Sequence, residues 1–454
     1  MMASGSRIDI TMSAPQLGKS LMLAQWLLAG AWQDGGRYPH WPSWWCAPTF
    51  EQARQGFLRY LVEPARTAGI LRSNTESVPL KAELVNGSTI EARSWDRPNG
   101  LYGPTVARIA VDEIGLITRE ARKAMFSRVR ETLIHGLGQI RGAGNVQEVG
   151  GEAEAMYQSA EGGRPGWTCR TWTWRDRASA APCGCDVTGL EIEDHGKHHP
   201  DCHRGIYLTG LSEEREDLGD SEFRQLYEAE WVDYSALPVY TFDRAIHVDA
   251  DRASYDPTLP VEISADFNVD PMSWILGQHH GDLAWDYDEI IIPGGATTDE
   301  ACTEFICRYP DRVTPVVVYG DASGASRKTT SKRSDYDIIR QRFRDYYRSV
   351  SFEVPAANPA VVQRINSVNA RHRNAAGTVR YWVHPRCKHL IRDRIRVSWR
   401  PGTREIDKRD KSLTHASDAA DYRLVRLYPV RTRNRTVSRR PTGPYSDPIL
   451  SETF

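Results

Sequence analysis

A short apolar run at residues 8–12 leads into the loop Ser-Ala-Pro-Gln-Leu-Gly-Lys-Ser at 13–20, and apolar residues at helical spacing follow over 21–28. This order of strand, glycine-containing loop and helix constrains the fold, because a buried strand that passes straight into a helix is typical of a parallel α/β sheet. The N–H groups of such a loop and the start of such a helix face one point, where they can bind a phosphate group. The start of the chain therefore predicts an α/β domain with an anion site at one edge of its sheet.

The residue types of this loop match a Walker A motif. Lys19 is placed to reach the β- and γ-phosphates of ATP, and Ser20 is placed to bind the Mg²⁺ ion. Gln16 and Gly18 are the other loop residues that we expect to contact the nucleotide. Ser13 stands where the motif usually has its first glycine. A chance occurrence of Gly-Lys-Ser is therefore the alternative interpretation of the loop.

A second apolar run, at residues 106–111, ends in Asp112 and Glu113. At the end of a buried strand, Asp112 is placed to hold Mg²⁺ through water, and Glu113 is placed to polarise the water that attacks the γ-phosphate. This is a Walker B pattern, and it follows the Walker A pattern in the proper order. The two motifs together predict a nucleotide-hydrolysing domain.

Three aspartates in the second half of the chain stand on separate predicted elements. Asp266 ends the apolar run that begins at Val261, and Asp321 follows the β-prone run at 315–320. Asp418 lies at the start of a predicted helix. A two-metal phosphodiesterase needs such hard oxygen ligands around Mg²⁺ or Mn²⁺ ions about 3.5–4 Å apart. Each aspartate alone is more simply explained as a turn former or a helix cap, but together they predict a metal-dependent nuclease.

Charge is unevenly placed along the chain. The net charge is −1 and the pI about 6.9, which argues against a constitutive DNA-coating protein. Between residues 386 and 440, however, 17 Lys and Arg stand against 6 Asp and Glu. Such a stripe predicts salt-sensitive binding to DNA without sequence preference, and a solvated basic surface is the alternative. The chain has no run of eighteen apolar residues and no secretion signal, so we expect neither a membrane span nor export.

Cysteine and histidine residues gather between 183 and 203. The eight cysteines of the chain are expected to be thiols in a reducing cytoplasm. Cys183 and Cys185 at one end, with His199 and Cys202 at the other, form a candidate tetrahedral Zn²⁺ site. The alternative is a histidine-rich surface loop without metal.

Taken together, these motifs resemble those of the large terminase subunit of tailed bacteriophages, and the resemblance spans nearly the whole chain. Residues 94–103 are similar to that family's Gly-Leu-Arg-Gly loop, and residues 138–146 stand in the place of its coupling motif. The segments Asp-Phe-Asn-Val-Asp-Pro from 266, Tyr-Gly-Asp-Ala-Ser-Gly from 319 and Leu-Thr-His-Ala-Ser-Asp ending at 418 are similar to its RNase H-like metal motifs.

The resemblance implies an ATP-driven motor that moves double-stranded DNA into a procapsid and an endonuclease that cuts concatemeric DNA. It implies ATP and Mg²⁺ or Mn²⁺ as cofactors, and a portal protein, a terminase small subunit and a homo-oligomeric ring as partners, in the cytoplasm of an infected host. It also assigns Asn145 to coupling and makes Asp421 a further candidate for the third metal ligand. Tyr102 stands where many relatives have an arginine that is a candidate trans-acting finger, so either Arg93 or Arg97 replaces it or the finger lies elsewhere in the chain.

On this basis we expect four segments. Residues 1–205 form a P-loop ATPase domain of α/β class that carries the Cys/His insertion, and residues 206–260 form a helical linker. Residues 261–428 form an RNase H-like α/β nuclease domain, and residues 429–454 form a basic, disordered tail. Two other functions remain open: a repair or recombination nuclease with an attached ATPase, for which we find no helicase motif set, and a non-catalytic packaging scaffold with a decayed ATPase.

Overall fold

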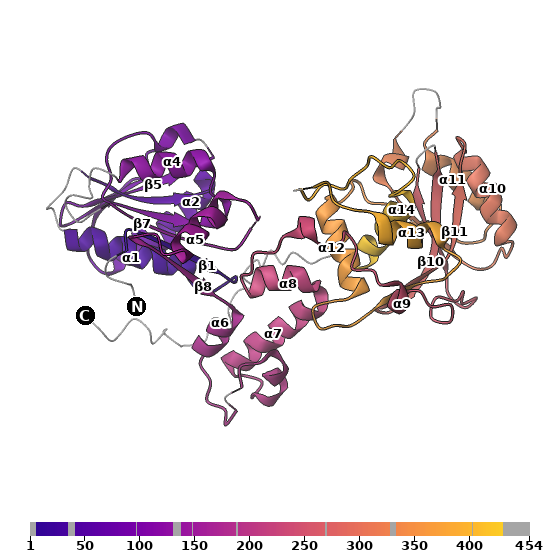
Figure 1. Ribbon diagram of the computed structural model, residues 1–454, viewed down its shortest axis with the longest axis horizontal. Helices are drawn as coiled ribbons and strands as arrows, with labels where there is room; N and C mark the ends of the chain where they lie inside the picture. The colour runs from indigo at the N-terminus through magenta and orange to yellow at the C-terminus, as the bar shows by residue number, and fades with distance from the viewer. Residues whose placement is uncertain are drawn as a thin grey trace.

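Two α/β units lie at opposite ends of the molecule, with a smaller group of helices between them (Figure 1). The computed structural model describes residues 6–34, 41–96, 98–129, 138–147, 149–187, 189–267, 270–326, 333–401 and 403–429. Within these ranges, none of the helices has the length and apolar character needed to span a bilayer. The predicted fold class, one α/β unit followed along the chain by a second α/β unit, is confirmed. The tail expected at 429–454 lies almost wholly outside the described residues.

The first unit is built on an eight-stranded sheet with the order β3-β4-β5-β2-β6-β7-β1-β8. Its strands are β1 Ile8–Ser13, β2 Ser43–Ala47, β3 Leu71–Asn74, β4 Lys81–Leu84, β5 Thr89–Ser94, β6 Arg108–Asp112, β7 Gln139–Gly144 and β8 Trp167–Trp172. In this spatial order, every pair of neighbouring strands from β5 across to β8 is parallel. Strands β3 and β4 extend the sheet beyond β5 in antiparallel fashion. Because both faces are covered, β1 and β2 are buried along their whole length.

Helices pack on both faces of this sheet. They are α1 Lys19–Asp34, α2 Phe50–Phe57, α3 Glu63–Thr67, α4 Arg119–Arg128 and α5 Glu152–Glu161, with a π-helical turn at Leu58–Val62. Neighbouring residues of a strand point to opposite faces, so Trp44 joins the core under α4 and α5, whereas Trp45 joins the core under α1 to α3. The sheet thereby separates two apolar cores.

The second unit has a six-stranded sheet with the order β13-β12-β9-β10-β11-β14. Its elements are β9 Val261–Asp266, β10 Met272–His280, β11 Leu283–Ile292, α10 Thr298–Arg308, β12 Val316–Gly320, α11 Asp335–Arg344, β13 Val350–Phe352, α12 Val361–His372, β14 Tyr381–Val383, α13 Lys388–Arg396 and α14 His415–Leu427. The antiparallel meander of β9, β10 and β11 is flanked by β12 and β13, which run parallel to β9. Helices α10 and α11 cover one face, and α12 to α14 cover the other.

The region between the two sheets contains a group of helices with a core of its own. Helices α6 Trp174–Ala180, α7 His203–Asp217 and α8 Asp220–Tyr227 share a core formed by Trp174, Ala178, Ile192, Leu208, Leu211, Leu218 and Phe223. This core crosses the boundary expected at residue 205, because the apolar face of α7 packs against α6 and the Cys/His segment. Further along, Val239 and Tyr240 are buried in the core of the second unit, and α9 Arg244–His247 follows them. Residues 206–260, for which we expected a helical linker, thus contain most of α7, all of α8 and α9, and the buried Val239 and Tyr240.

Candidate active sites

The loop between β1 and α1 has the backbone shape of a phosphate-binding loop. Gln16 and Gly18 both adopt the left-handed conformation, with φ of 62° and 78°. A Cβ on Gly18 would meet nothing within 4 Å, so glycine is favoured there by its φ and not by lack of space. Helix α1 begins at Lys19, and the N–H groups of its first turn have no intrahelical acceptors. The loop and the helix start therefore fit a phosphate group.

Lys19 lies almost buried at this edge of the sheet, with 7% of its surface exposed. Its Nζ donates a hydrogen bond to Oδ1 of Asn145, which directly follows β7. Since β7 lies between β1 and β6, Asn145 stands between the two nucleotide motifs. Burial lowers the pKa of Lys19, and the negative charges of Glu113 and Asp112 oppose that shift. Asn145, the predicted coupling residue, therefore contacts Lys19, the predicted phosphate-binding residue.

Ser20 and Asp112 are also in direct contact. The hydroxyl of Ser20 lies 2.9 Å and 3.0 Å from the two carboxylate oxygens of Asp112, at the end of β6. Burial raises the pKa of Asp112 to about 6, although the hydrogen bond from Ser20 opposes this. A hydroxyl and a carboxylate that meet beside a phosphate-binding loop are the oxygen donors that Mg²⁺ prefers. The two side chains therefore fit the predicted Mg²⁺ role.

Two glycines let the turn after β6 approach the end of β7. A Cβ on Gly115 would lie 2.1 Å from the carbonyl oxygen of Asn145, and a Cβ on Gly144 would lie 2.8 Å from the backbone nitrogen of Gly115. Glu113 opens this turn in the left-handed conformation, with φ of 56°. Only glycine allows such close backbone packing, which holds Asn145 near Lys19.

Of the two arginines expected to replace Tyr102, the structure describes Arg93. Tyr102 is 58% exposed. Arg93 is occupied within its own sheet, because its guanidinium lies 2.5 Å from Glu91 and stacks over the ring of Trp44. Arg97 lies outside the described residues.

Two of the predicted nuclease aspartates lie side by side at one edge of the second sheet. Asp266 is the last residue of β9, and Asp321 directly follows β12. The two strands are parallel neighbours with Gly320 opposite Ala265, and the backbone nitrogen of Asp321 donates to the carbonyl of Ala265 at 3.1 Å. The carboxyl ends of parallel neighbours necessarily meet at the same edge.

Asp418 approaches Asp266 from helix α14, whose Ala419 carbonyl accepts a hydrogen bond from Ser264 of β9. Burial raises the pKa of Asp418 to about 6, and the charge of Asp266 adds to the shift. Burial also raises the pKa of Tyr422, one turn further along α14. The charges of Asp321, Asp418 and Asp266 all add to that second shift, so the three carboxylates share one neighbourhood.

Each of these carboxylates has a protein partner. Asp266 faces Nδ1 of His415 at 3.3 Å, and Asp418 accepts from Arg364. Asp321 accepts from the hydroxyl of Ser323 at 2.7 Å and from the amide of Asn358 at 2.6 Å.

Among the described residues, only the Cys/His cluster brings three or more candidate ligand atoms within 4.8 Å of one another.

Asp421, the further candidate for the third ligand, does not face this site. Its carboxylate is fully buried, accepts from the hydroxyl of Tyr240 at 2.8 Å and pairs with Arg394 at 2.5 Å. Sequence reasoning also missed His415 and Arg364 as neighbours of the aspartates. His415 stands three residues before Asp418, which is contact distance on a helix, whereas nothing in the sequence marks Arg364.

The basic stripe at 386–440 includes residues that face inward. Arg394 and Arg423 are buried, and Arg423 pairs with Glu262 and, at 2.7 Å, with Asp286. Part of the positive charge in this stripe therefore neutralises buried carboxylates and is not available to DNA. Residues 430–440 lie outside the described part of the chain.

The Cys/His cluster forms with one change of residue. Cys183, Cys185 and Cys202 come together as predicted, but the histidine among them is His198. The side chain of His199 is 72% exposed and lies 3.8 Å from Asp201. His198 directly follows the 3₁₀ turn Ile192–Lys197 as its C-cap residue.

No protein-family model and no curated protein matches this sequence. The structure is nevertheless similar to solved structures of the large terminase from a thermophilic bacteriophage. One crystal form of that protein gives a TM-score of 0.51 at 15% identity over 92% of this chain and 93% of that chain. Another form, in complex with ADP, gives a TM-score of 0.50 at 15% identity over 92% and 94%. The chain therefore has the fold of a bacteriophage large terminase.

Proposed function

We propose that this chain is the motor and nuclease of a phage DNA-packaging machine. It would move double-stranded DNA into a procapsid by ATP hydrolysis and cut concatemeric DNA at the second site. The observation that carries the proposal is the presence in one chain of two separate oxygen-rich sites, each at the edge of its own sheet. One contains Lys19, Ser20 and Asp112, and the other contains three aspartates.

In the first site, the loop N–H groups and the start of α1 bind the phosphates, and Lys19 neutralises their charge. Ser20 and Asp112 hold the Mg²⁺ ion, and Glu113 orients the attacking water. Asn145 holds Lys19 in place. ATP supplies the phosphoryl group whose transfer to water drives movement. The contact of Asn145 with Lys19 supports a coupling role for Asn145.

In the second site, Asp266, Asp321 and Asp418 would hold Mg²⁺ or Mn²⁺. The bound metal would supply activation of a water molecule and stabilisation of the leaving oxygen of the scissile phosphodiester. His415 orients Asp266, and Asn358 orients Asp321. Lys408, whose positive charge opposes the rise in the pKa of Asp418 that burial causes, is exposed and is proposed to contact a DNA phosphate.

The same fold supports the partners that we propose, namely double-stranded DNA, a portal protein, a terminase small subunit and further copies of this chain in a ring. The setting would be the cytoplasm of an infected host. The intact contacts of Lys19 and Ser20 favour this function over a scaffold with a decayed ATPase.

Metal-dependent cleavage of supercoiled plasmid tests the nuclease half. Wild-type chain should nick plasmid with Mn²⁺ or Mg²⁺, lose this activity in excess chelator and regain it when metal is restored. Asp321→Ala should lose more than about 100-fold of the rate, because it removes a metal ligand. Asp251→Ala, at an exposed aspartate before β9, is the matched control and should cleave like wild type. Cleavage that persists in chelator would overturn the metal assignment.

A further inference from the structure

Four side chains in the segment between α6 and α7 place their metal-binding atoms within 4.8 Å of one another. They belong to Cys183, Cys185, His198 and Cys202. Nδ1 of His198 lies 3.5 Å from Sγ of Cys183 and 3.7 Å from Sγ of Cys202. Tetrahedral Zn²⁺, with Zn–S of about 2.3 Å and Zn–N of about 2.0–2.1 Å, holds sulfur and nitrogen ligands about 3.6 Å apart. The cluster therefore already has the spacing of a zinc site.

The backbone around the cluster favours thiolates. Cys202 is the N-cap residue of α7, so its sulfur lies at the positive end of that helix. The backbone nitrogen of His199 donates to Sγ of Cys185 at 3.3 Å. A helix N-terminus and a backbone N–H group directed at sulfur stabilise the negative charge of a thiolate, which is the form that binds a metal ion.

His198 is fixed against the same helix. It is 7% exposed, and a Cβ added to Gly205 would lie 2.7 Å from the Cβ of His198. The absence of a side chain at Gly205 thus lets the imidazole lie on the first turn of α7. With Nδ1 turned toward the sulfurs, the ring is held in the orientation that a metal ligand needs.

We propose that Cys183, Cys185, His198 and Cys202 bind one structural Zn²⁺ ion. Three thiolates and one imidazole complete a tetrahedron and leave no position open for a substrate, which is the pattern of a structural site. The softness of this donor set selects zinc over the Mg²⁺ or Mn²⁺ expected at the aspartates.

The surrounding helices explain why a metal would be needed. Among the described residues, their core contains only seven buried apolar side chains, and the residues between α6 and α7 form no strand. Small units of this kind commonly rely on a metal or a disulfide for stability. An ion at the start of α7 would link the loop between α6 and α7 to α7, which contributes Leu208 and Leu211 to this core.

Elemental analysis of protein purified under reducing conditions should give about one equivalent of zinc that survives dialysis. Ions at the aspartates would exchange under the same conditions, because all-oxygen sites bind less tightly. If zinc has been lost in purification, Co²⁺ added to the reduced chain should produce a thiolate-to-cobalt absorption band and the visible bands of tetrahedral Co²⁺. Protein without zinc that also fails both Co²⁺ signatures would overturn the proposal, as would iron in place of zinc.

Two adjacent histidines provide the matched pair of variants. His198→Ala should weaken zinc binding by more than about 100-fold, since losing a ligand costs more than losing an outer-shell partner. His199→Ala should keep the metal, because that side chain is 72% exposed. Zinc loss in His199→Ala alone would overturn this ligand set. If the variants fold poorly, thiol titration of the native wild-type chain gives an independent result: three of its eight cysteines should react only after chelation. Their immediate reaction would contradict the site.

Discussion

At the scale of single residues, Asp418 and Asp421 show how one helix can give two aspartates different roles. Both are on α14 and both are buried, at 8% and 0% exposed. Asp418 faces Asp266 and the open sheet edge, whereas Asp421 is enclosed by Tyr240 and Arg394. A carboxylate surrounded by its own cation and hydroxyl has no lone pairs directed at a metal, so it stabilises the fold instead.

Substituting the two aspartates separately should separate these roles. Asp418→Asn should abolish plasmid cleavage and leave the melting temperature near that of wild type. Arg364 loses the carboxylate of Asp418 in this variant, but the carboxylate of Asp421 still lies 3.7 Å from its guanidinium. Asp421→Asn should destabilise the nuclease unit by roughly 3–5 kcal/mol, because it leaves the buried guanidinium of Arg394 without its anion. Plasmid cleavage and thermal melting of both variants measure the difference. Normal cleavage by Asp418→Asn would remove this residue from the site.

At the scale of elements, the start of α14 is capped by another helix. Its own N-cap residue, Thr414, has φ of 81° and makes no side-chain cap. Asp393 of α13, which is fully buried, accepts instead from the backbone nitrogens of Ala416 at 3.0 Å and Ser417 at 3.2 Å. The carboxylate thereby fixes the first turn of α14, on which Asp418 lies.

Removing this cap should affect both stability and cleavage. Asp393→Ala should cost about 1–2 kcal/mol, the value of a lost helix cap, and should slow cleavage by letting Asp418 move. Asp393→Asn retains a carbonyl oxygen that can accept the same N–H groups, so it should restore much of both properties. Denaturant unfolding and plasmid nicking provide the readouts. An Asn variant as impaired as the Ala variant would show that charge, and not capping, is what matters.

The elements that could be predicted from sequence are those with a local signal. Apolar runs that end in a carboxylate gave β6, β9 and β12 and the aspartates at their ends, because a strand necessarily delivers its last residue to the sheet edge. No such signal indicated that His198, and not His199, would join the three cysteines, because the directions of these two side chains depend on the local backbone conformation. Arg364 was also missed, because its pairing with Asp418 spans α12 and α14.

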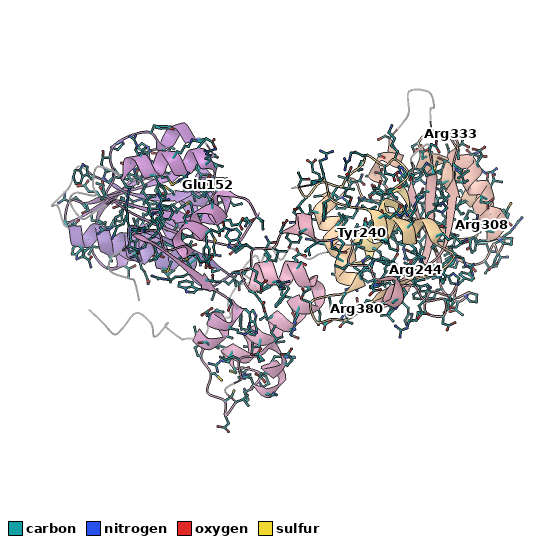
Figure 2. All side chains as sticks on the ribbon, viewed as in Figure 1. Glu152, Tyr240, Arg244, Arg308, Arg333 and Arg380 are labelled. Atoms are coloured by element: carbon teal, nitrogen blue, oxygen red, sulfur yellow. The ribbon has the colours of Figure 1, made fainter. Side chains whose placement is uncertain are left out.

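At the scale of the whole molecule, the middle helices contact both α/β units. Gln225 of α8 donates to the carbonyl of Gln147, two residues after Asn145. On the other side, the backbone carbonyl and the carboxylate of Glu216 accept from Asn374 and Arg380 of the nuclease unit. Figure 2 shows Arg380 on the side of that unit that faces the helices. The two candidate sites are thus linked through a separate unit and share no residues. The core of this middle unit combines residues from both sides of residue 205, where we expected the first segment to end, because long-range packing between helices leaves no local signal in the sequence.

ATP hydrolysis and plasmid cleavage, measured on the same preparations of Lys19→Ala and Asp321→Ala, test most directly whether one chain holds two separable sites. Lys19→Ala should lose more than about 100-fold in ATP hydrolysis, because it removes the charge that clamps the phosphates, and should still nick plasmid within about two-fold of wild type. Asp321→Ala should show the reverse. Loss of both activities in either variant, or full cleavage by Asp321→Ala, would contradict the two-site account.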